Sequence, residues 1–273
     1  MDDLDADPFV GIRYRPAMPF APFDLTGHVA LVTGGNGGIG LGMADGLAQA
    51  GADVAIWGTN DDKNAAAAER LEAHGTRVVA LRCDVGDEEA VDAAFAATVE
   101  ALGKVDSCFA NAGIGGTMAR FTEASTDDWR RVMRVNLDGA FFTLRAAARH
   151  LVERGEGGSL VATSSLSAIE GAARNQAYAS TKGALVAMIR ALSVEFAPKG
   201  IRANAILPGW IETAMTEPAF NWDRFRDNVL PRIPAGRWGA AEDFAGVAVY
   251  LASRASAYHT GDTIVIDGAY SLF

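Results

Sequence analysis

HVALVTGGNGGIG, at residues 28–40, joins an apolar run to a glycine-rich turn. The run HVALVT (28–33) is continuously apolar and predicts a buried strand. After the turn, apolar side chains recur at helical spacing, which predicts a helix; they are Ile39, Met43, Leu47 and Ala50. Glycines between a strand and a helix allow a tight turn and leave helix N–H groups pointing at a phosphate. The stretch therefore indicates a pyrophosphate site, with a flexible turn that binds nothing as the alternative.

The same alternation of apolar run and helical stripe continues along the chain. Six more runs predict strands: DVAIWG (53–58), RVVALR (77–82), VDSCFA (105–110), GSLVAT (158–163), IRANAIL (201–207) and DTIVID (262–267). Two further stripes predict helices: Val91, Phe95, Val99 and Leu102, then Leu185, Ile189, Leu192 and Phe196. Strand followed by helix, repeated, requires parallel pairing. We expect an α/β fold: one doubly wound, Rossmann-type domain at 27–273, with a seven-stranded parallel sheet flanked by helices.

Residues 1–26 differ from the rest of the chain. They carry early aspartates and Pro8, Pro16, Pro19 and Pro22, which are four of the nine prolines, and they show no periodicity. Proline lacks a backbone N–H and fixes its own φ angle, so it disfavours helices and central strands. An extended N-terminal arm is predicted at 1–26.

Composition limits the class of protein. The 24 basic and 34 acidic residues leave a net charge of −10, and no basic block occurs, which argues against nucleic acid and anionic membranes as partners. Cys83 and Cys108 each lie in an apolar run and are expected to be reduced and buried. The chain start is acidic and no apolar stretch is long enough for a membrane span, so a cytoplasmic location is expected. No metal site is expected, because the histidines have no ligand spacing: His28, His74, His150 and His259.

Tyr178 and Lys182 are four residues apart, which places both on one face of a helix. Together with other motifs they resemble the classical short-chain dehydrogenase/reductase family. The motifs occur in that family's order and intervals: TGGNGGIG (33–40), CDV (83–85), ANAG (110–113), Asn136 in RVNLDG, Ser165 in ATSSLS, YASTK (178–182) and PGWIET (208–213). The resemblance runs from about Leu25 to Phe273.

The resemblance implies an NAD(P)-dependent oxidoreductase that transfers hydride between nicotinamide and a secondary alcohol or ketone. Tyr178 would be the acid/base, Ser165 would hold the substrate oxygen, Lys182 would fix the nicotinamide ribose, and Asn136 would anchor a water. An ammonium about 4 Å away at an effective dielectric of about 20 would supply the roughly 4 kcal/mol that lowers a tyrosine pKa from about 10 to about 7. Asn136 has a second interpretation, as a residue that interrupts a helix.

The same family assigns a cofactor site. Its residues are Gly34, Asn36, Gly38, Ile39, Gly40, Gly58, Thr59, Asp84, Val85, Asn111, Ala112, Gly113, Tyr178, Lys182, Pro208, Gly209, Ile211 and Thr213. Asp84 would accept a hydrogen bond from adenine, or alternatively would cap a helix. An acid just after the second strand usually selects NAD and an arginine NADP, but Gly58 and Thr59 stand there. With Gly37 uncharged and Asp61 and Asp62 nearby, NAD is favoured over NADP.

Residues 210–236 are where the family places a mobile lid over the substrate. The segment holds Met215, Phe220, Trp222 and Phe225, whose alternative role is core packing, and Arg224, Arg226 and Arg232, which are candidate ligands for a carboxylate. A small-molecule alcohol or ketone is the expected substrate, and the apolar C-terminal end resembles the family's tetramer contacts, so a homotetramer is expected. Two rivals remain: an NADPH-dependent 3-oxoacyl reductase, and a dinucleotide-sensing protein without catalysis.

Overall fold

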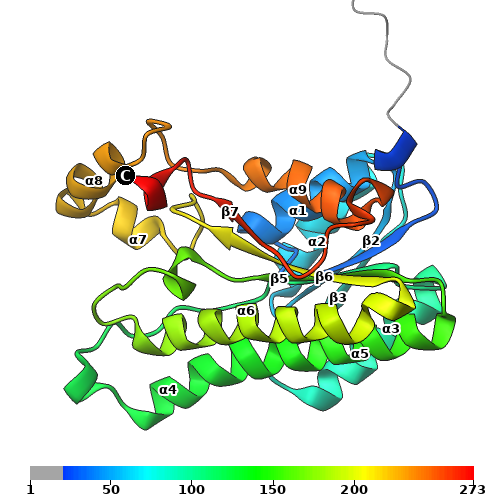
Figure 1. Ribbon diagram of the computed structural model, residues 1–273, viewed down its shortest axis with the longest axis horizontal. Helices are drawn as coiled ribbons and strands as arrows, with labels where there is room; N and C mark the ends of the chain where they lie inside the picture. Colours follow the sequence, from blue (N-terminus) through cyan, green and yellow to red (C-terminus); the bar gives the residue numbers. More distant parts are fainter. Residues whose placement is uncertain (1–20) are drawn as a thin grey trace, which may run out of the picture.

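The computed structural model describes residues 21–273 and shows one sheet between two layers of helices (Figure 1). All strand pairs are parallel, in the order β3-β2-β1-β4-β5-β6-β7. The strands are β1 (Val29–Thr33), β2 (Asp53–Gly58), β3 (Val78–Arg82), β4 (Ser107–Ala110), β5 (Gly158–Thr163), β6 (Ile201–Pro208) and β7 (Thr263–Ile266). Each coincides with one predicted apolar run to within two residues. The predicted doubly wound fold is confirmed.

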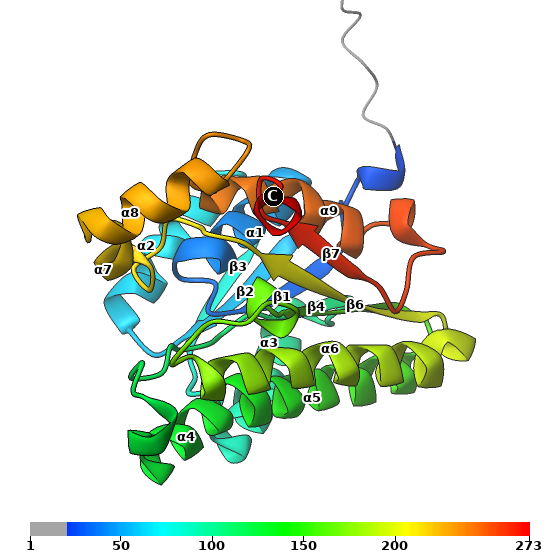
Figure 2. The ribbon, with the colours of Figure 1, turned by 60° about the vertical axis from the view of Figure 1, so that its left-hand side comes forward.

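The helices divide into two layers and a peripheral pair (Figure 2). One layer holds α3 (Glu88–Leu102), α4 (Thr126–Met133), α5 (Gly139–Arg154) and α6 (Gln176–Phe196). The other holds α1 (Gly38–Gln49), α2 (Asp61–Glu72) and α9 (Ala245–Ala252). The short helices α7 (Glu217–Phe220) and α8 (Asp223–Val229) follow β6 and lie beyond its carboxyl end, near the C-terminus (Figure 1).

Each face of the sheet has its own apolar core. Successive side chains of a strand point to opposite faces, so Val29 and Leu31 of β1 belong to the core under α3, α5 and α6, whereas Ala30 and Val32 belong to the core under α1 and α9. The continuous apolar runs of the sequence follow from this double coverage. Trp57 of β2 is fully buried, and its indole N–H donates to Thr98 Oγ1 at 3.1 Å, so its one polar atom is satisfied.

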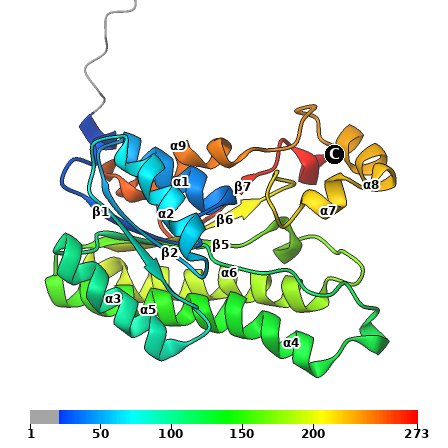
Figure 3. The ribbon, with the colours of Figure 1, turned by 180° about the vertical axis from the view of Figure 1, so that it is seen from behind.

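The packed chain begins inside the segment predicted as an arm. Residues 1–20 of that segment lie outside the described residues. Ala21–Phe23 form a short 3₁₀ turn, and Leu25 is only 2% exposed and donates its N–H to the carbonyl of Ala50 at 2.9 Å. Leu25 thus closes the edge of the core under α1, ahead of the boundary expected at residue 27. Figure 3 shows this segment at the end of the molecule opposite α7 and α8.

Both cysteines are free and buried, as predicted. Burial raises the pKa of the Cys83 thiol to about 11 and that of Cys108 to about 12, so neither carries a thiolate at neutral pH. Within residues 21–273, no helix combines the length and the apolar character needed to cross a bilayer.

Candidate active site

The glycine-rich turn lies at the point where the strand order reverses. β1 pairs with β2 on one side and β4 on the other, which opens a crevice at the carboxyl ends of these strands. Gly34 has a φ of +65° and Gly38 a φ of +50°, in the left-handed region that favours glycine. A Cβ on Gly40 would lie 2.2 Å from the carbonyl oxygen of Gly34. The glycines are therefore required by the turn itself, whether or not a ligand is present.

Space remains for a ligand at the start of α1. A Cβ on Gly37 would have no heavy atom within 4 Å, and Gly37 precedes the first turn of α1, whose N–H groups have no partner within the helix. Ile39 packs against the core under this helix and so anchors the turn to the core. This open cradle at a helix N-terminus fits a pyrophosphate, as expected from the sequence.

Thr33 joins the glycine-rich turn to the motif after β4, a role that the sequence did not assign to it. Its Oγ1 accepts hydrogen bonds from the backbone N–H groups of Asn111 and Ala112, both at 3.0 Å, and the Asn111 side chain donates back to the Thr33 carbonyl at 3.0 Å. Thr33 is the first residue of the TGGNGGIG motif, and its place in that motif is the sequence signal that could have revealed this role. Two motifs 78 residues apart are thereby held as one surface.

The end of β2 contains an amide pair in place of a charged selector. Asn36 donates to Asn64 Oδ1 at 2.7 Å, and Asn64, which is buried, donates to the carbonyls of Gly58 and Leu81. A Cβ on Gly58 would lie 2.1 Å from Asn36 Nδ2, so an acidic side chain there would require the Asn36 amide to move. Thr59 is exposed beside this pair. Neither usual selector stands here, and the amide pair occupies the space next to Gly58.

Asp84, in the loop after β3, is held by Arg134, a partner that the sequence did not predict. Arg134 donates to Asp84 Oδ2 at 2.9 Å, while Oδ1 accepts the N–H of Gly86. The alternative that Asp84 caps a helix is wrong, because Asp87 caps α3 by accepting from the N–H groups of residues 89 and 90. Val85 is buried against α5 and fixes the backbone of this loop.

The segment after β6 faces the glycine-rich turn. A Cβ on Gly209 would lie 2.6 Å from the Asp267 side chain, so Gly209 permits the close passage of Pro208 toward the crevice. Ile211 is buried, and Thr213 lies against Gly38, since a Cβ there would come within 3.0 Å of Thr213 Cγ2. The glycine-rich turn, predicted to contact the pyrophosphate, and Thr213, predicted to contact the nicotinamide end, are thus adjacent in space.

Ser165, Tyr178 and Lys182 come together at the carboxyl end of β5. Ser165 caps the turn after β5, and its hydroxyl is hydrogen-bonded to Tyr178. Tyr178 and Lys182 lie on one face of α6, as their spacing predicts, with Lys182 Nζ 5.4 Å from the centre of the tyrosine ring. The ammonium is 3% exposed and donates one hydrogen bond, to the Thr163 carbonyl at 2.7 Å.

The electrostatics of this pair differ from expectation. Burial raises the pKa of Tyr178, and the hydrogen bond from Ser165 offsets only part of that rise, so the predicted lowering to about 7 is wrong for the ligand-free chain. The ammonium lies against the ring and not at the hydroxyl. Burial also lowers the pKa of Lys182 to about 8, because nothing anionic compensates its charge. A buried ammonium with donors to spare fits the hydroxyls of a ribose.

Asn136 lies in a π-helical turn, Arg134–Asp138, between α4 and α5. Its side chain accepts from the N–H of Ile114 at 2.8 Å and donates to the carbonyl of Ile114 at 2.9 Å. Asn136 interrupts the helix, as one interpretation predicts, and its side chain faces Ile114; its role as the anchor of a water stays a prediction. A Cβ on Gly113 would lie 3.4 Å from Asn136 Oδ1 and 3.6 Å from Lys182 Nζ, so the two polar groups border one small space.

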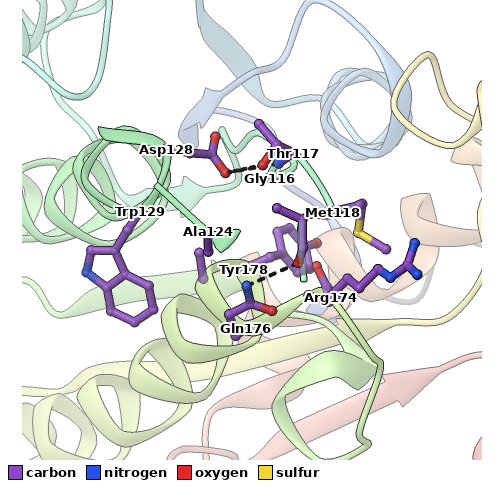
Figure 4. A pocket seen from close by; sticks show the side chains of 12 residues that line it. Gly116, Thr117, Met118, Ala124, Asp128, Trp129, Arg174, Gln176 and Tyr178 are labelled. Carbon is purple, nitrogen blue, oxygen red and sulfur yellow. Dashed lines mark hydrogen bonds between the residues drawn. The ribbon is translucent and has the colours of Figure 1, made fainter. Parts of the chain in front are cut away.

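A pocket opens beside Tyr178, between the loop after β4 and the start of α6 (Figure 4). Trp129 and Arg174 lie on opposite sides of Tyr178 in this view, and Gln176 donates to the Ala119 carbonyl at 3.4 Å. Met118 and Arg174 have φ values of +56° and +66°, a conformation that costs energy for residues with a side chain. Two strained positions thus flank the candidate acid/base.

The segment at 210–236 forms a roof of aromatic rings over the carboxyl end of β6. Phe220 stacks on Trp238 at 4.1 Å between ring centres, and Phe225 meets Trp210 edge-on at 4.9 Å. Both phenylalanines thus pack against tryptophan rings, whereas two other apolar residues of the segment, Met215 and Trp222, are exposed. The candidate carboxylate ligands Arg226 and Arg232 already have partners in Asp223 and Tyr270.

Comparison with known proteins places the chain in a family. Residues 34–271 match the family model described as Enoyl-(Acyl carrier protein) reductase. The L-rhamnose 1-dehydrogenase (NAD(P)(+)) of Sphingomonas sp. (strain SKA58) is 40% identical over 245 residues, which are 89% of this chain and 96% of that protein. The 3-oxoacyl-[acyl-carrier-protein] reductase of Chlamydia pneumoniae is 37% identical over 246 residues, covering 89% and 97%.

A solved structure agrees with these relatives. The gluconate 5-dehydrogenase of Burkholderia cenocepacia J2315, in complex with NADP and tartrate, superimposes with a TM-score of 0.87 at 36% identity, covering 92% of this chain and 98% of that one. Its fold and those of the relatives extend over nearly all of the described residues. The chain belongs to the classical short-chain dehydrogenase/reductase family and is an NAD(P)-dependent oxidoreductase that acts on CH–OH groups.

Proposed function

We propose that Tyr178 is the acid and base of this oxidoreduction, acting on a secondary alcohol and its ketone. The observation that carries the proposal is the cluster at the carboxyl end of β5, where the Tyr178 hydroxyl meets Ser165 and the ammonium of Lys182 lies against the ring. A bound nicotinamide supplies the hydride acceptor or donor. On oxidation, the alcohol O–H proton passes to Tyr178 as the C–H electron pair leaves as hydride and the C=O bond forms; on reduction, Tyr178 returns the proton.

The other residues of the cluster support that proton transfer. Ser165 holds the substrate oxygen by the hydroxyl that now bonds Tyr178, and Lys182, with a pKa of about 8, carries a positive charge at neutral pH that favours the tyrosinate. Because burial raises the pKa of Tyr178, the resting enzyme holds the proton, which suits it to donate one to a ketone. Asn136 anchors a water in the space above Gly113 that it shares with Lys182.

The substrate that we propose is a polyhydroxylated small molecule, a sugar or a sugar acid. Two of the similar proteins are named for such substrates, an L-rhamnose dehydrogenase and a gluconate dehydrogenase. The pocket beside Tyr178 is rich in polar side chains, among them Thr117, Asn175 and Gln176. Arg174 is exposed at its rim and has no acidic partner among the described residues, so it is placed to meet a carboxylate.

A 3-oxoacyl reductase is the second candidate. Its support is the relative of that name and the description of the matching family model. No relative supports a dinucleotide sensor without catalysis.

We further propose that NAD is preferred over NADP, that residues 210–236 close over the substrate, and that the enzyme is a cytoplasmic homotetramer. The absence of side chains at Gly58 and Gly37, with Asp61 close by, disfavours a second phosphate. The exposed apolar residues Val194, Leu272 and Phe273 are suited to contact further copies of the chain. The two free thiols suit a reducing compartment.

The deciding experiment is a Tyr178→Phe substitution assayed on aldoses, aldonates and 3-oxoacyl thioesters. We expect turnover to fall by about 10²–10⁴-fold while NADH still binds, since general acid–base catalysis contributes about that much. Tyr258→Phe is the matched control, because the Tyr258 side chain is fully exposed, and its activity should equal that of the wild type. Full activity in Tyr178→Phe would disprove the assigned role.

A further inference from the structure

Arg82 lies at the end of β3, next to the carboxyl end of β2. It is the last residue of β3 and pairs in register with Gly58, the last residue of β2. Val78 and Ala80 of β3 pack into the core under α1, and side chains two apart share a face, so Arg82 lies on the face covered by α2. It is therefore beside the residues after β2 that usually choose between the two cofactors.

An ion pair holds Arg82 in this position. Its guanidinium contacts Asp61 Oδ2 at 2.9 Å, at the first residue of α2, and the two side chains are 70% and 64% exposed. Exposed pairs of this kind contribute little to stability and exchange partners readily. A phosphate dianion is a stronger partner for a guanidinium than one carboxylate, and it accepts two parallel N–H bonds.

Few residues around Arg82 carry a positive charge. Gly37 and Thr59 carry no charge, and Asp61 and Asp62 open α2 with Lys63 as the one cation of its first turn. Asn60 caps the helix by accepting the backbone N–H of Lys63, and the Lys63 ammonium remains a second cation near this point.

We propose that Arg82 binds the 2′-phosphate of NADP(H), and that Asp61, by holding Arg82, sets the ratio of NADP to NAD binding. This inference rests on the dinucleotide site of the proposed function and adds the residue that chooses between the cofactors. While Arg82 is paired with Asp61, the enzyme binds NAD better than NADP. When the Asp61 carboxylate moves away, the 2′-phosphate of NADP binds the Arg82 guanidinium in its place.

The test uses the full-length protein and measures the dissociation constants of NADH and NADPH by nicotinamide fluorescence, with no substrate. Arg82→Ala should weaken NADPH binding by about tenfold or more and NADH binding by less than about twofold, which corresponds to the loss of one strong charge-assisted contact. Asp61→Asn should tighten NADPH binding several-fold, and the double variant Asp61→Asn/Arg82→Ala should lose that gain. The NADPH affinity of Asp61→Asn should also fall more steeply with salt than its NADH affinity.

The matched control is Arg77→Ala, at the opposite end of β3. Arg77 forms the same type of ion pair, with Asp53 at 2.7 Å, and is 60% exposed, so the variant removes an equal charge far from the carboxyl ends. Its NADPH to NADH ratio should match the wild type. The proposal is overturned if Arg82→Ala changes that ratio no more than Arg77→Ala does, or if neither cofactor binds. The expected ratios without turnover on any alcohol would support Arg82 and count against the proposed reaction.

Discussion

Replacing Lys182 with methionine should make the ligand-free protein more stable, although most substitutions of buried residues destabilise. Methionine keeps the length and apolar stem of lysine but carries no charge. Burial without an anionic partner lowers the pKa of Lys182 from 10.5 to about 8. That difference means that the folded state holds the ammonium at a cost of about 3 kcal/mol at pH 7.

Replacing Lys182 with methionine removes one hydrogen bond. The Thr163 carbonyl loses the hydrogen bond from Nζ at 2.7 Å, which costs about 1 kcal/mol. The net gain in unfolding free energy is therefore about 2 kcal/mol, or about 4–8 °C in Tm for a domain of this size. Turnover should be lost in the same variant, since the charge that favours the tyrosinate is gone.

The gain in unfolding free energy of Lys182→Met should disappear at high pH. Between pH 8 and pH 10.5 the folded wild type binds fewer protons than the unfolded chain, so its stability rises with pH in that window and the cost of the ammonium is relieved. The difference between Lys182→Met and wild type should shrink by about 2 kcal/mol from pH 7 to pH 9.5.

The assay is thermal and urea unfolding without cofactor at both pH values. Lys199→Met is the control, because Lys199 lies exposed just after α6, and this variant should change little at either pH. A Lys182→Met protein that unfolds at or below the wild-type temperature at pH 7 would refute the reasoning, as would a gain that is undiminished at pH 9.5.

Three further predictions test the crevice, each by thermal unfolding and NADH titration. Gly40→Ala should cost about 2 kcal/mol or more through its clash with the Gly34 carbonyl, whereas Gly37→Ala, with open space, should leave Tm nearly unchanged; equal effects would contradict the geometry. Thr33→Val should cost about 2–4 kcal/mol by leaving two backbone N–H groups unpaired, and Thr33→Ser should restore most of it. Gly58→Asp should lower both Tm and NADH affinity, because Asn36 occupies the space; tighter NADH binding would show that the amide pair gives way.

The strands of the sheet could be predicted because the burial of each strand determines the composition of that strand alone. A parallel strand covered on both faces must be mainly apolar along its length, and runs such as DVAIWG and RVVALR have this composition. Likewise, the four-residue spacing of Tyr178 and Lys182 fixes a shared helix face. The beginning of the packed chain at Leu25 was harder, since one leucine among prolines carries no periodicity.

Contacts between distant segments could not be predicted in this way. The amide of Asn36 occupies the space that a side chain at position 58 would need, and its position depends on Asn64, which no motif includes. The position of the Lys182 ammonium over the ring, and the burial that raises the pKa of Tyr178, depend on rotamers and packing and not on spacing. The family pattern supplied the identity of the residues but not their protonation.

The π-helical turn that carries Asn136 has a consequence for how this chain tolerates length changes. A π turn holds one residue more than an α turn, and each residue advances a helix by about 100°. Deleting any one residue of Arg134–Asp138 would therefore leave a regular helix, yet it would turn α4 relative to α5 and rotate the amide away from Ile114. The extra residue brings the Asn136 side chain to Ile114. A one-residue deletion, usually among the worst changes inside a helix, should here be well folded and inactive.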